Sequence, residues 1–390
     1  MTPPARHAAA IDILDQLIAG EAVEKTLSNW GRRNRYAGSG DRAAIRDIVF
    51  SCLRCLRSTA AMGGGKTGRG MVLGYLRGQG VDPFTVFTGE KYAPTALRDT
   101  ELSPVVDPES LPNAVRLDCP DWAEPCLRAY LGDGFEDAMR LNQTRAPLFL
   151  RVNSRKSDRQ GAIKILTEQG ITAIANGLSP TALEVTEHPR RVAQCVAYQS
   201  GIVEIQDAAS QAVVEDLPIK DGQKILDYCA GGGGKSLAMG ARAAVEILAH
   251  DSNPARMRDL VKRANRAGVR IDTVEGLTAG QMALFDLVLV DAPCSGSGTW
   301  RRNPAAKWDL TEAKLLEYCA DQAKILDDAA RFVAAGGCLA YVTCSIFDQE
   351  NGVQIAEFLR KHPGWRLQNS RQLSPLDGGD GMYMANLFTR

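Results

Sequence analysis

The chain has 390 residues, of which 45% are hydrophobic and 24% charged, and its 46 basic and 46 acidic side chains give no net charge. This length exceeds one average domain and predicts two or three domains, each with its own core. A net charge of zero excludes a protein that attracts nucleic acid by its overall charge, so such binding would need local basic clusters. The sequence has neither a long apolar run nor the apolar core of a signal peptide, so we expect a cytoplasmic protein.

The cysteines do not form the pattern of a disulfide framework or of a metal site. In a large cytoplasmic chain, the 10 cysteines indicate buried thiols together with a few reactive ones. Cys52 and Cys55 form a CxxC half-site, but no second pair follows, and the chain has 4 histidines. We therefore expect no bound metal.

The first part of the chain is predicted to be helical. Within 1–75, apolar residues recur at helical spacing in AAAIDILDQLIAG and in DRAAIRDIVFSCLRCL, and Asp41 is placed to cap the second helix. The stretch MGGGKTGRG, from Met62 to Gly70, interrupts this pattern. Residues 76–144 contain several prolines and are predicted to form a mixed, partly helical connector.

The second part predicts two α/β regions. In 145–199, PLFLRVNSRK and TALEVTE are strand candidates on either side of a helix in GAIKILTEQG, which indicates a small α+β module. In 200–390, helices alternate with the apolar strands KILDYCA, VEILAHD, IDTVEG, FDLVLVDA and CLAYVTC. This alternation predicts a parallel, doubly wound, Rossmann-like sheet with helices on both faces.

Two cysteines directly follow apolar strands of this predicted sheet. Cys294 comes after FDLVLVDAP, and Cys344 ends CLAYVTC. Ligands bind at the carboxyl edge of such sheets, so we expect the two thiols to meet in one crevice. A pair of thiols suits chemistry that makes and then breaks a carbon–sulfur bond, although either cysteine alone could be small apolar filler.

A glycine-rich turn, DYCAGGGGKS, follows the first strand of the sheet. Its exposed amides and the helix N-terminus behind it favour a phosphate or a carboxylate. The turn is neither a P-loop, because Cys229 replaces the first required glycine, nor GxGxxG, whose last glycine is replaced by Ser236 or Leu237. Asp251, at the end of the second strand, could accept hydrogen bonds from a ribose or cap the helix near Pro254.

The segments DYCAGGGGKS, AHDSN, VDAPCSGSGTWRRNP and YVTCSIFDQENG together resemble the Sun-type family of RNA 5-methylcytosine methyltransferases, which use S-adenosylmethionine. The resemblance covers roughly 145 to 390. The N-terminal helices resemble the NusB-type RNA-binding domain of the bacterial member that methylates small-subunit ribosomal RNA. The chain departs from the family at Gly232, where a proline is usual, and at Leu277, where an aspartate near the adenine is usual; Asp272 and Glu275 are nearby.

The resemblance implies a role for each candidate site residue. Cys344 would be the nucleophile that attacks C6 of cytosine, Cys294 would assist product release, and Asp291 would protonate or hydrogen-bond N3 of the base. Lys235, Lys307 or the sulfonium of the cofactor would lower the pKa of the Cys344 thiol. The implied S-adenosylmethionine site consists of Cys229, Ala230, Gly231, Gly232, Gly233, Gly234, Lys235, Asp251 and Asp291.

The expected partner is RNA, most simply ribosomal RNA with a single-stranded or flipped cytosine, because the base must leave its stack to meet a thiol. The basic residues expected to contact phosphates are Arg151, Arg155, Lys156, Arg301, Arg302 and Lys307. Two alternatives remain open, namely a methyltransferase with another substrate such as transfer RNA, and a non-catalytic RNA-binding assembly factor that keeps the fold.

Overall fold

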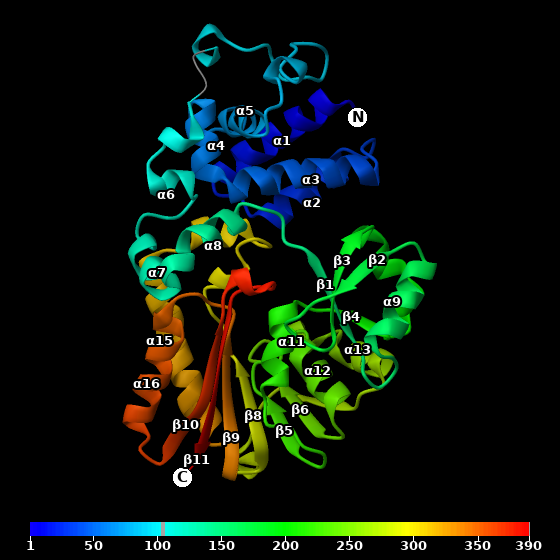
Figure 1. Ribbon diagram of the computed structural model, residues 1–390, viewed down its shortest axis with the longest axis vertical. Coiled ribbons are helices and arrows are strands. Elements are labelled where there is room, and N and C mark those ends of the chain that lie inside the picture. The colour runs from blue at the N-terminus through cyan, green and yellow to red at the C-terminus, as the bar shows by residue number, and fades with distance from the viewer. Residues whose placement is uncertain (103–105, 390) are drawn as a thin grey trace. The chain divides into compact units, whose positions relative to one another are not determined.

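A computed structural model describes residues 1–102 and 106–389 of the chain (Figure 1). The described chain divides into two compact units. The first consists of Met1–Arg128, Asp133–Arg145 and Trp300–Asp309, and the second of Ala129–Gly132, Ala146–Thr299 and Leu310–Arg390. Residues 300–309, which the sequence placed in the sheet domain, therefore belong to the unit of the N-terminal helices. No helix in the described ranges is long and apolar enough to cross a membrane.

The first unit is helical, as the apolar spacing predicted. Its helices are α1 (Pro3–Ile18), α2 (Val23–Arg33), α3 (Ser39–Arg54), α4 (Leu56–Gly63), α5 (Gly68–Gly78), α6 (Asn113–Arg116), most of α7 (Glu124–Leu131), α8 (Phe135–Asn142) and α14 (Pro304–Asp309). The apolar faces of α1 to α5 and of α14 share one core, which includes Ile13, Ile45 and Leu73. The predicted cap of α3 is displaced: Gly38 is the N-cap, and Asp41 lies in the first turn, where it accepts a hydrogen bond from the Gly38 amide.

The second unit begins with the small α+β module, and its predicted strands and helix are present. Its elements are β1 (Leu148–Val152), α9 (Arg159–Glu168), β2 (Thr172–Ala175), β3 (Ala182–Glu187), α10 (Val196–Gln199) and β4 (Val203–Ile205). The four strands form an antiparallel sheet in the order β2-β3-β1-β4. The strands β2 and β4 were not predicted, because each is too short to show a period in the sequence.

The larger sheet has seven strands in the order β10-β11-β9-β8-β5-β6-β7. The elements are α11 (Ala208–Glu215), β5 (Lys224–Asp227), α12 (Gly234–Arg242), β6 (Glu246–His250), α13 (Leu260–Ala267), β7 (Ile271–Val274), β8 (Phe285–Asp291), α15 (Glu312–Ala330), β9 (Val333–Thr343), α16 (Gly352–Lys361), β10 (Trp365–Leu373) and β11 (Met382–Thr389). One core joins the sheet to α11, α12 and α13, and a second joins it to α15 and α16 (Figure 1). Helices thus cover both faces, which confirms the Rossmann-like α/β fold.

The sheet differs from the prediction at its C-terminal end. The strands β7, β6, β5, β8 and β9 are parallel, but β11 runs antiparallel to β9 and to β10. The sheet is therefore mixed. Short 3-10 helices complete the chain, at Pro83–Thr85, Asp99–Glu101, Pro108–Ser110, Gly132–Gly134, Pro189–Gln194, Pro254–Met257, Ala279–Gln281, Ser297–Thr299, Asp348–Glu350 and Pro375–Asp377.

Candidate active site

The two cysteines meet at the carboxyl edge of the larger sheet. The strands β8 and β9 are parallel neighbours, with Asp291 opposite Val342. Cys294 and Cys344 follow these two strands, and their sulfur atoms lie 3.4 Å apart. Both side chains are half-buried, so both remain accessible. The structure therefore brings together the two thiols that the strand pattern placed at one edge.

Backbone contacts hold the two cysteine loops against each other. The Gly298 amide donates a hydrogen bond to the carbonyl of Cys344 at 3.0 Å, and the Gly298 carbonyl accepts one from the Gly381 amide at 2.9 Å. A Cβ atom at residue 298 would lie 1.9 Å from the carbonyl oxygen of Gly381. Only glycine fits this close approach, which gives the second glycine of CSGSG a structural reason.

A partly buried ion pair joins α12 to the end of β8. The Nζ atom of Lys235, in the first turn of α12, lies 2.7 Å from Oδ2 of Asp291 at the end of β8. Burial by itself lowers the pKa of Lys235, but the charge and hydrogen bond of Asp291, with a further contribution from Cys344, raise it overall. Lys235 is therefore a cation that interacts with Cys344, as one of the predicted sources of thiol activation requires.

The glycine turn after β5 is fixed by Asp251. The carboxylate of Asp251 accepts hydrogen bonds from the amides of Gly231 and Asn253, both at 2.9 Å, and pairs with Arg256 at 3.1 Å. Asp251 does not cap the following helix, since Asn253 caps the 3-10 helix that begins at Pro254. Gly233 has a φ of +76°, and a Cβ atom there would lie 2.0 Å from Cδ1 of Leu260.

The sequence did not single out Asp227, which ends β5 under the glycine turn. Its side chain is 1% exposed. Oδ2 accepts a hydrogen bond from Ser236 at 2.5 Å, whereas Oδ1 is buried without a partner among the described residues. Burial raises the pKa of Asp227 to about 7, although the Ser236 hydrogen bond opposes the shift. The site thus contains a buried acceptor with unused hydrogen-bonding capacity.

Asn351 is a second residue that the sequence did not single out. Its Oδ1 accepts a hydrogen bond from Thr343 at 2.5 Å, and its Nδ2 donates to the carbonyl of Ser345 at 3.0 Å and to the Tyr130 hydroxyl at 2.7 Å. Thr343 and Ser345 flank Cys344, so Asn351 holds the residues on both sides of that thiol, through the Thr343 hydroxyl and the Ser345 carbonyl. Asn351 lies in the segment TCSIFDQENG, which was part of the family resemblance, but only Cys344 in this segment was assigned a role.

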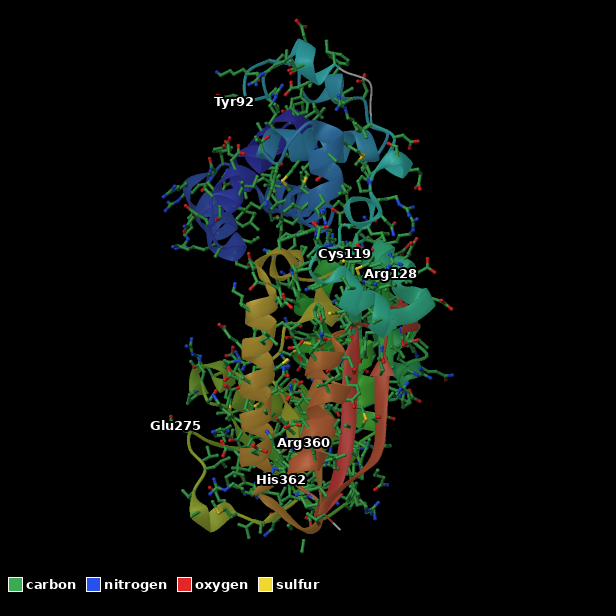
Figure 2. All side chains as sticks on the ribbon, turned by 90° about the vertical axis from the view of Figure 1, so that its left-hand side faces the viewer. Tyr92, Cys119, Arg128, Glu275, Arg360 and His362 are labelled. Carbon is green, nitrogen blue, oxygen red and sulfur yellow. The ribbon has the colours of Figure 1, made fainter. Side chains whose placement is uncertain are left out.

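The acidic residues on β7 and directly after it lie at the protein surface. Asp272 and Glu275 are exposed, and Glu275 lies on the loop after β7 at the surface (Figure 2). Asp272 pairs with Arg270 at 3.5 Å. Leu277 is half-buried and packs against the apolar cluster that contains Phe332. Leu277 therefore provides an apolar side chain at the position where the family usually has an aspartate.

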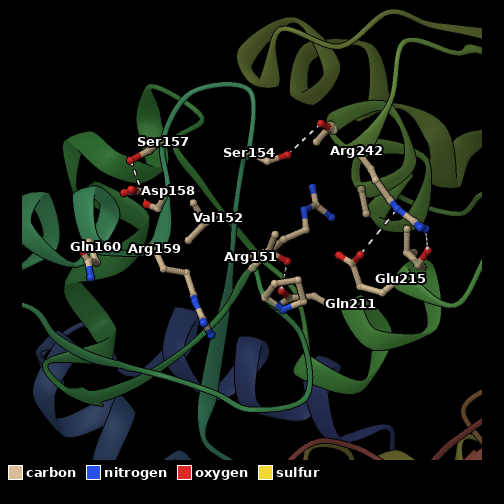
Figure 3. A pocket seen from close by; sticks show the side chains of 15 residues that line it. Arg151, Val152, Ser154, Ser157, Asp158, Arg159, Gln160, Gln211, Glu215 and Arg242 are labelled. Carbon is tan, nitrogen blue, oxygen red and sulfur yellow. Dashed lines mark hydrogen bonds and ion pairs between the residues drawn. The ribbon is translucent and has the colours of Figure 1, made fainter. Parts of the chain in front are cut away.

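Each of the three basic candidates in the small module donates to a backbone carbonyl in the segment that carries the larger sheet. Arg151 is buried, and its Nη1 donates to Gln206 and, at 2.8 Å, to the carbonyl of Gly234. Arg151 also lines a pocket of about 760 Å³ between the β1–α9 loop and the helices α11 and α12, whose lining includes neither active-site cysteine (Figure 3). Arg155 and Lys156 are exposed. Arg155 nevertheless donates a hydrogen bond to the carbonyl of Ala243 at 3.0 Å, and Lys156 donates to the carbonyls of Ser200 and Arg266.

The three remaining basic candidates lie in the first unit. Lys307 is 1% exposed and donates to the carbonyl of Arg54 at 3.0 Å. Burial lowers its pKa, which Asp118 partly opposes. Lys307 is therefore unavailable to a phosphate or to the Cys344 thiol, contrary to our prediction, because its position is internal. Arg301 and Arg302 are half-buried, and Arg301 donates to Thr144 and to the carbonyl of Arg145.

Comparisons with known proteins agree with this architecture. The family model of the 16S rRNA methyltransferase RsmB/F matches residues 214–388, and the model of the ferredoxin-like domain of the RsmF/B-like methyltransferases matches residues 119–192. Two solved structures from Pyrococcus horikoshii share the fold. A methyltransferase homologue protein is 22% identical with a TM-score of 0.61 and covers 73% of this chain and 100% of its own. The protein NSun6 with SFG is 17% identical with a TM-score of 0.58 and covers 69% and 98%.

Curated relatives extend the similarity to the whole chain. The ribosomal RNA small subunit methyltransferase B of Erwinia tasmaniensis is 33% identical over 282 residues, which are 69% of this chain and 66% of the relative. The protein of the same name from Yersinia enterocolitica is 28% identical, and the alignment covers 99% of this chain and 98% of the relative. The chain belongs to the RsmB/F methyltransferase family.

Proposed function

We propose that the protein is an S-adenosylmethionine-dependent RNA (cytosine-C5) methyltransferase whose substrate is ribosomal RNA. The observation that carries the proposal is the pair of accessible thiols 3.4 Å apart at the carboxyl edge of the sheet. The names of the curated relatives support ribosomal RNA as the substrate. A thiol pair also favours carbon methylation of a pyrimidine over methylation of a nitrogen or oxygen atom, which needs no covalent step.

The residues around the glycine turn fit S-adenosylmethionine. The unused acceptor Oδ1 of Asp227 suits a donor such as the cofactor's amino group. The amides of the turn and of the start of α12 suit its carboxylate, and Asp251 follows the second strand of the sheet, β6, the position of the acidic residue that holds a ribose in dinucleotide-binding folds. The structural relative NSun6, solved with SFG, an S-adenosylmethionine analogue, supports this assignment. When bound, the cofactor supplies an electrophilic methyl group.

Side chains at the carboxyl edge of the larger sheet perform the other steps of the proposed reaction. The thiolate of Cys344 forms a bond to C6 of the cytosine, which makes C5 electron-rich enough to take the methyl group. The Lys235–Asp291 pair delivers a proton to N3 through the Asp291 carboxyl group, which neutralises the negative charge that the addition puts on the ring. Transfer of the C5 proton to water then lets the C6–sulfur bond break, and its electron pair returns to Cys344 as the thiolate. Cys294, within reach of Cys344, assists this release.

The RNA contacts are proposed more narrowly than the sequence suggested. Arg301 and Arg302 are half-buried and Arg155 is exposed, so these three keep charge at the surface. We propose that they contact phosphates. Arg151 and Lys307 are left out of this set, because both side chains are buried and their donors bind groups inside the protein, whereas the exposed Lys156 stays a candidate beside Arg155.

Methyl transfer from labelled S-adenosylmethionine tests the proposal. Ribosomal RNA and transfer RNA are incubated separately with the wild type, with Cys344→Ala and with Cys319→Ala, a matched control at a half-buried cysteine of α15. We expect 5-methylcytidine in digests of ribosomal RNA from the wild type and the control, and none from Cys344→Ala. Label in transfer RNA alone would overturn the substrate, and label in neither RNA would overturn the activity.

A further inference from the structure

A buried carboxylate lies behind the two thiols. Glu350 ends the 3-10 helix Asp348–Glu350, and its side chain is 0% exposed. Its Oε1 accepts hydrogen bonds from the Ser295 amide at 2.8 Å and from Nε2 of Gln322 at 3.0 Å. Its Oε2 accepts hydrogen bonds from the hydroxyls of Ser295, at 2.5 Å, and Ser345. Both carboxylate oxygens are therefore fully used.

These partners indicate that Glu350 carries its negative charge. The Ser295 amide can only donate, and Gln322 is oriented as a donor because the same Nε2 also donates to the carbonyl of Pro293 at 3.0 Å. An ionised carboxylate accepts all four hydrogen bonds, whereas a protonated acid would have to turn the hydroxyl of Ser295 or Ser345 from a donor into an acceptor. None of the four partners carries a formal charge, so the charge of Glu350 is not neutralised by these contacts.

Glu350 also joins the two loops that carry the thiols. Ser295 directly follows Cys294, and Ser345 directly follows Cys344. One carboxylate therefore holds both loops through adjacent hydrogen bonds, and Gln322 adds a connection from α15 to Pro293. This arrangement fixes the sulfur atoms at their separation of 3.4 Å.

We propose that Glu350 is a positioning residue that keeps the shared proton of the thiol pair on Cys294, so that Cys344 is the thiol that ionises. Glu350 accepts two hydrogen bonds from Ser295, which follows Cys294, and one from Ser345, which follows Cys344, so its charge is tied more closely to the Cys294 loop. The cation Lys235, in contrast, interacts with Cys344. A thiolate is therefore disfavoured at Cys294 and favoured at Cys344. In the 3.4 Å contact, Cys294 is then the donor and Cys344 the acceptor.

The electrostatic surroundings support this division. The hydrogen bond to Cys344, burial, and the charges of Cys344 and Glu350 all raise the pKa of Cys294. Three other titratable groups are affected by Glu350, namely Tyr318 and Cys319 on α15 and Tyr341 on β9, and burial is the main cause that raises the pKa of each. Each of these groups is neutral near pH 7, so they do not compensate the charge of Glu350.

The inference rests on the proposed function, to which it adds the protonation state of each of the two cysteines. It can be tested without RNA or cofactor. Folded protein is treated with limiting iodoacetamide, which reacts with thiolates, and alkylation is measured separately at Cys294 and Cys344 by peptide mass spectrometry. The variants are Glu350→Gln, which keeps the size and removes the charge, and Ser345→Ala, which keeps the charge and removes one hydrogen bond. The control is Glu317→Gln, the same change on an exposed part of α15.

In the wild type and in Glu317→Gln, we expect Cys344 to be alkylated about tenfold faster than Cys294 near pH 7, and Ser345→Ala to preserve this preference. In Glu350→Gln the preference should fall by about tenfold, which corresponds to a shift of one pKa unit between the thiols. An unchanged ratio in folded Glu350→Gln would overturn the proposal. If this variant does not fold, faster alkylation of Cys294 than of Cys344 in the wild type would overturn it. Absence of methyl transfer, with the expected alkylation ratios, would refute the proposed function alone.

Discussion

The substitution Asp227→Asn should remove a large pH dependence from the stability of the second unit. Asp227 is 1% exposed, and burial raises its pKa from 3.8 to about 7. This difference of about 3 units corresponds to about 4 kcal/mol, since one unit is worth about 1.4 kcal/mol. An asparagine keeps the shape of the side chain and cannot ionise, so the variant does not lose this free energy of unfolding as the pH rises.

The direction of the effect follows from proton binding in the two states. Below about pH 4, Asp227 is protonated in both the folded and the unfolded chain and contributes no pH dependence. Between about pH 4 and pH 7 the unfolded chain releases the proton while the folded chain retains it, so the free energy of unfolding falls as the pH rises. Above about pH 7 both states are ionised and the loss is complete.

Native-state hydrogen exchange of peptides from β5 to α12, corrected for the intrinsic exchange rate, measures this local stability. From pH 5 to pH 8 the wild type should lose about 3 kcal/mol relative to Asp227→Asn, because about 2 of the 3 units are titrated in that interval. The control is Asp286→Asn, an exposed aspartate of the neighbouring strand β8, which should behave as the wild type. Equal pH dependence in the wild type and Asp227→Asn would refute the reasoning.

Three further substitutions give expected outcomes. Gly233→Ala should lower the unfolding free energy by about 1 to 3 kcal/mol in denaturant unfolding, because its φ is +76° and the new Cβ would lie 2.0 Å from Leu260. The control Gly222→Ala, at a φ of +82° with no atom within 4 Å, should lose less, and an equal loss would contradict the packing argument. Arg302→Ala should flatten the slope of log K against log salt for RNA binding by roughly 0.7 to 0.9, and an unchanged slope would exclude its phosphate contact. Lys307→Met should leave that slope unchanged in the same filter-binding measurement, and a flatter slope would show that Lys307 reaches the RNA.

Much of the fold could be predicted because local patterns and the final structure agree. The strands β8 and β9 are long apolar runs that are buried on both faces, so their period and their ends were visible in the sequence. The strand β10 was missed because six of its nine side chains are exposed or half-buried polar groups without a clear period. The antiparallel direction of β11 could not be predicted, because it depends on a pairing with β9 that no local pattern encodes.

The site was predictable at its thiols and less so around them. Cys294 and Cys344 could be placed because each follows an apolar strand, and parallel strands end at one edge. Lys307 was wrongly assigned because a lysine is ordinarily exposed, and its burial depends on partners such as Arg54 and Asp118, which are far away in the sequence. Glu350 escaped notice for the same reason: a glutamate is rarely buried, and its four donors come from three separate segments.

The central claim is that Cys344 attacks the cytosine and that Cys294 assists product release. Trapping the covalent intermediate tests this claim most directly. Cys294→Ala is incubated with ribosomal RNA and S-adenosylmethionine, digested with nuclease and protease, and the nucleotide-bearing peptide is identified by mass spectrometry. We expect a stable adduct in which a methylated cytosine is bound to Cys344, because release is impaired while the attack is not. The double variant Cys294→Ala, Cys344→Ala should give no adduct. An adduct on any other residue, or full turnover by Cys294→Ala without an adduct, would contradict the claim.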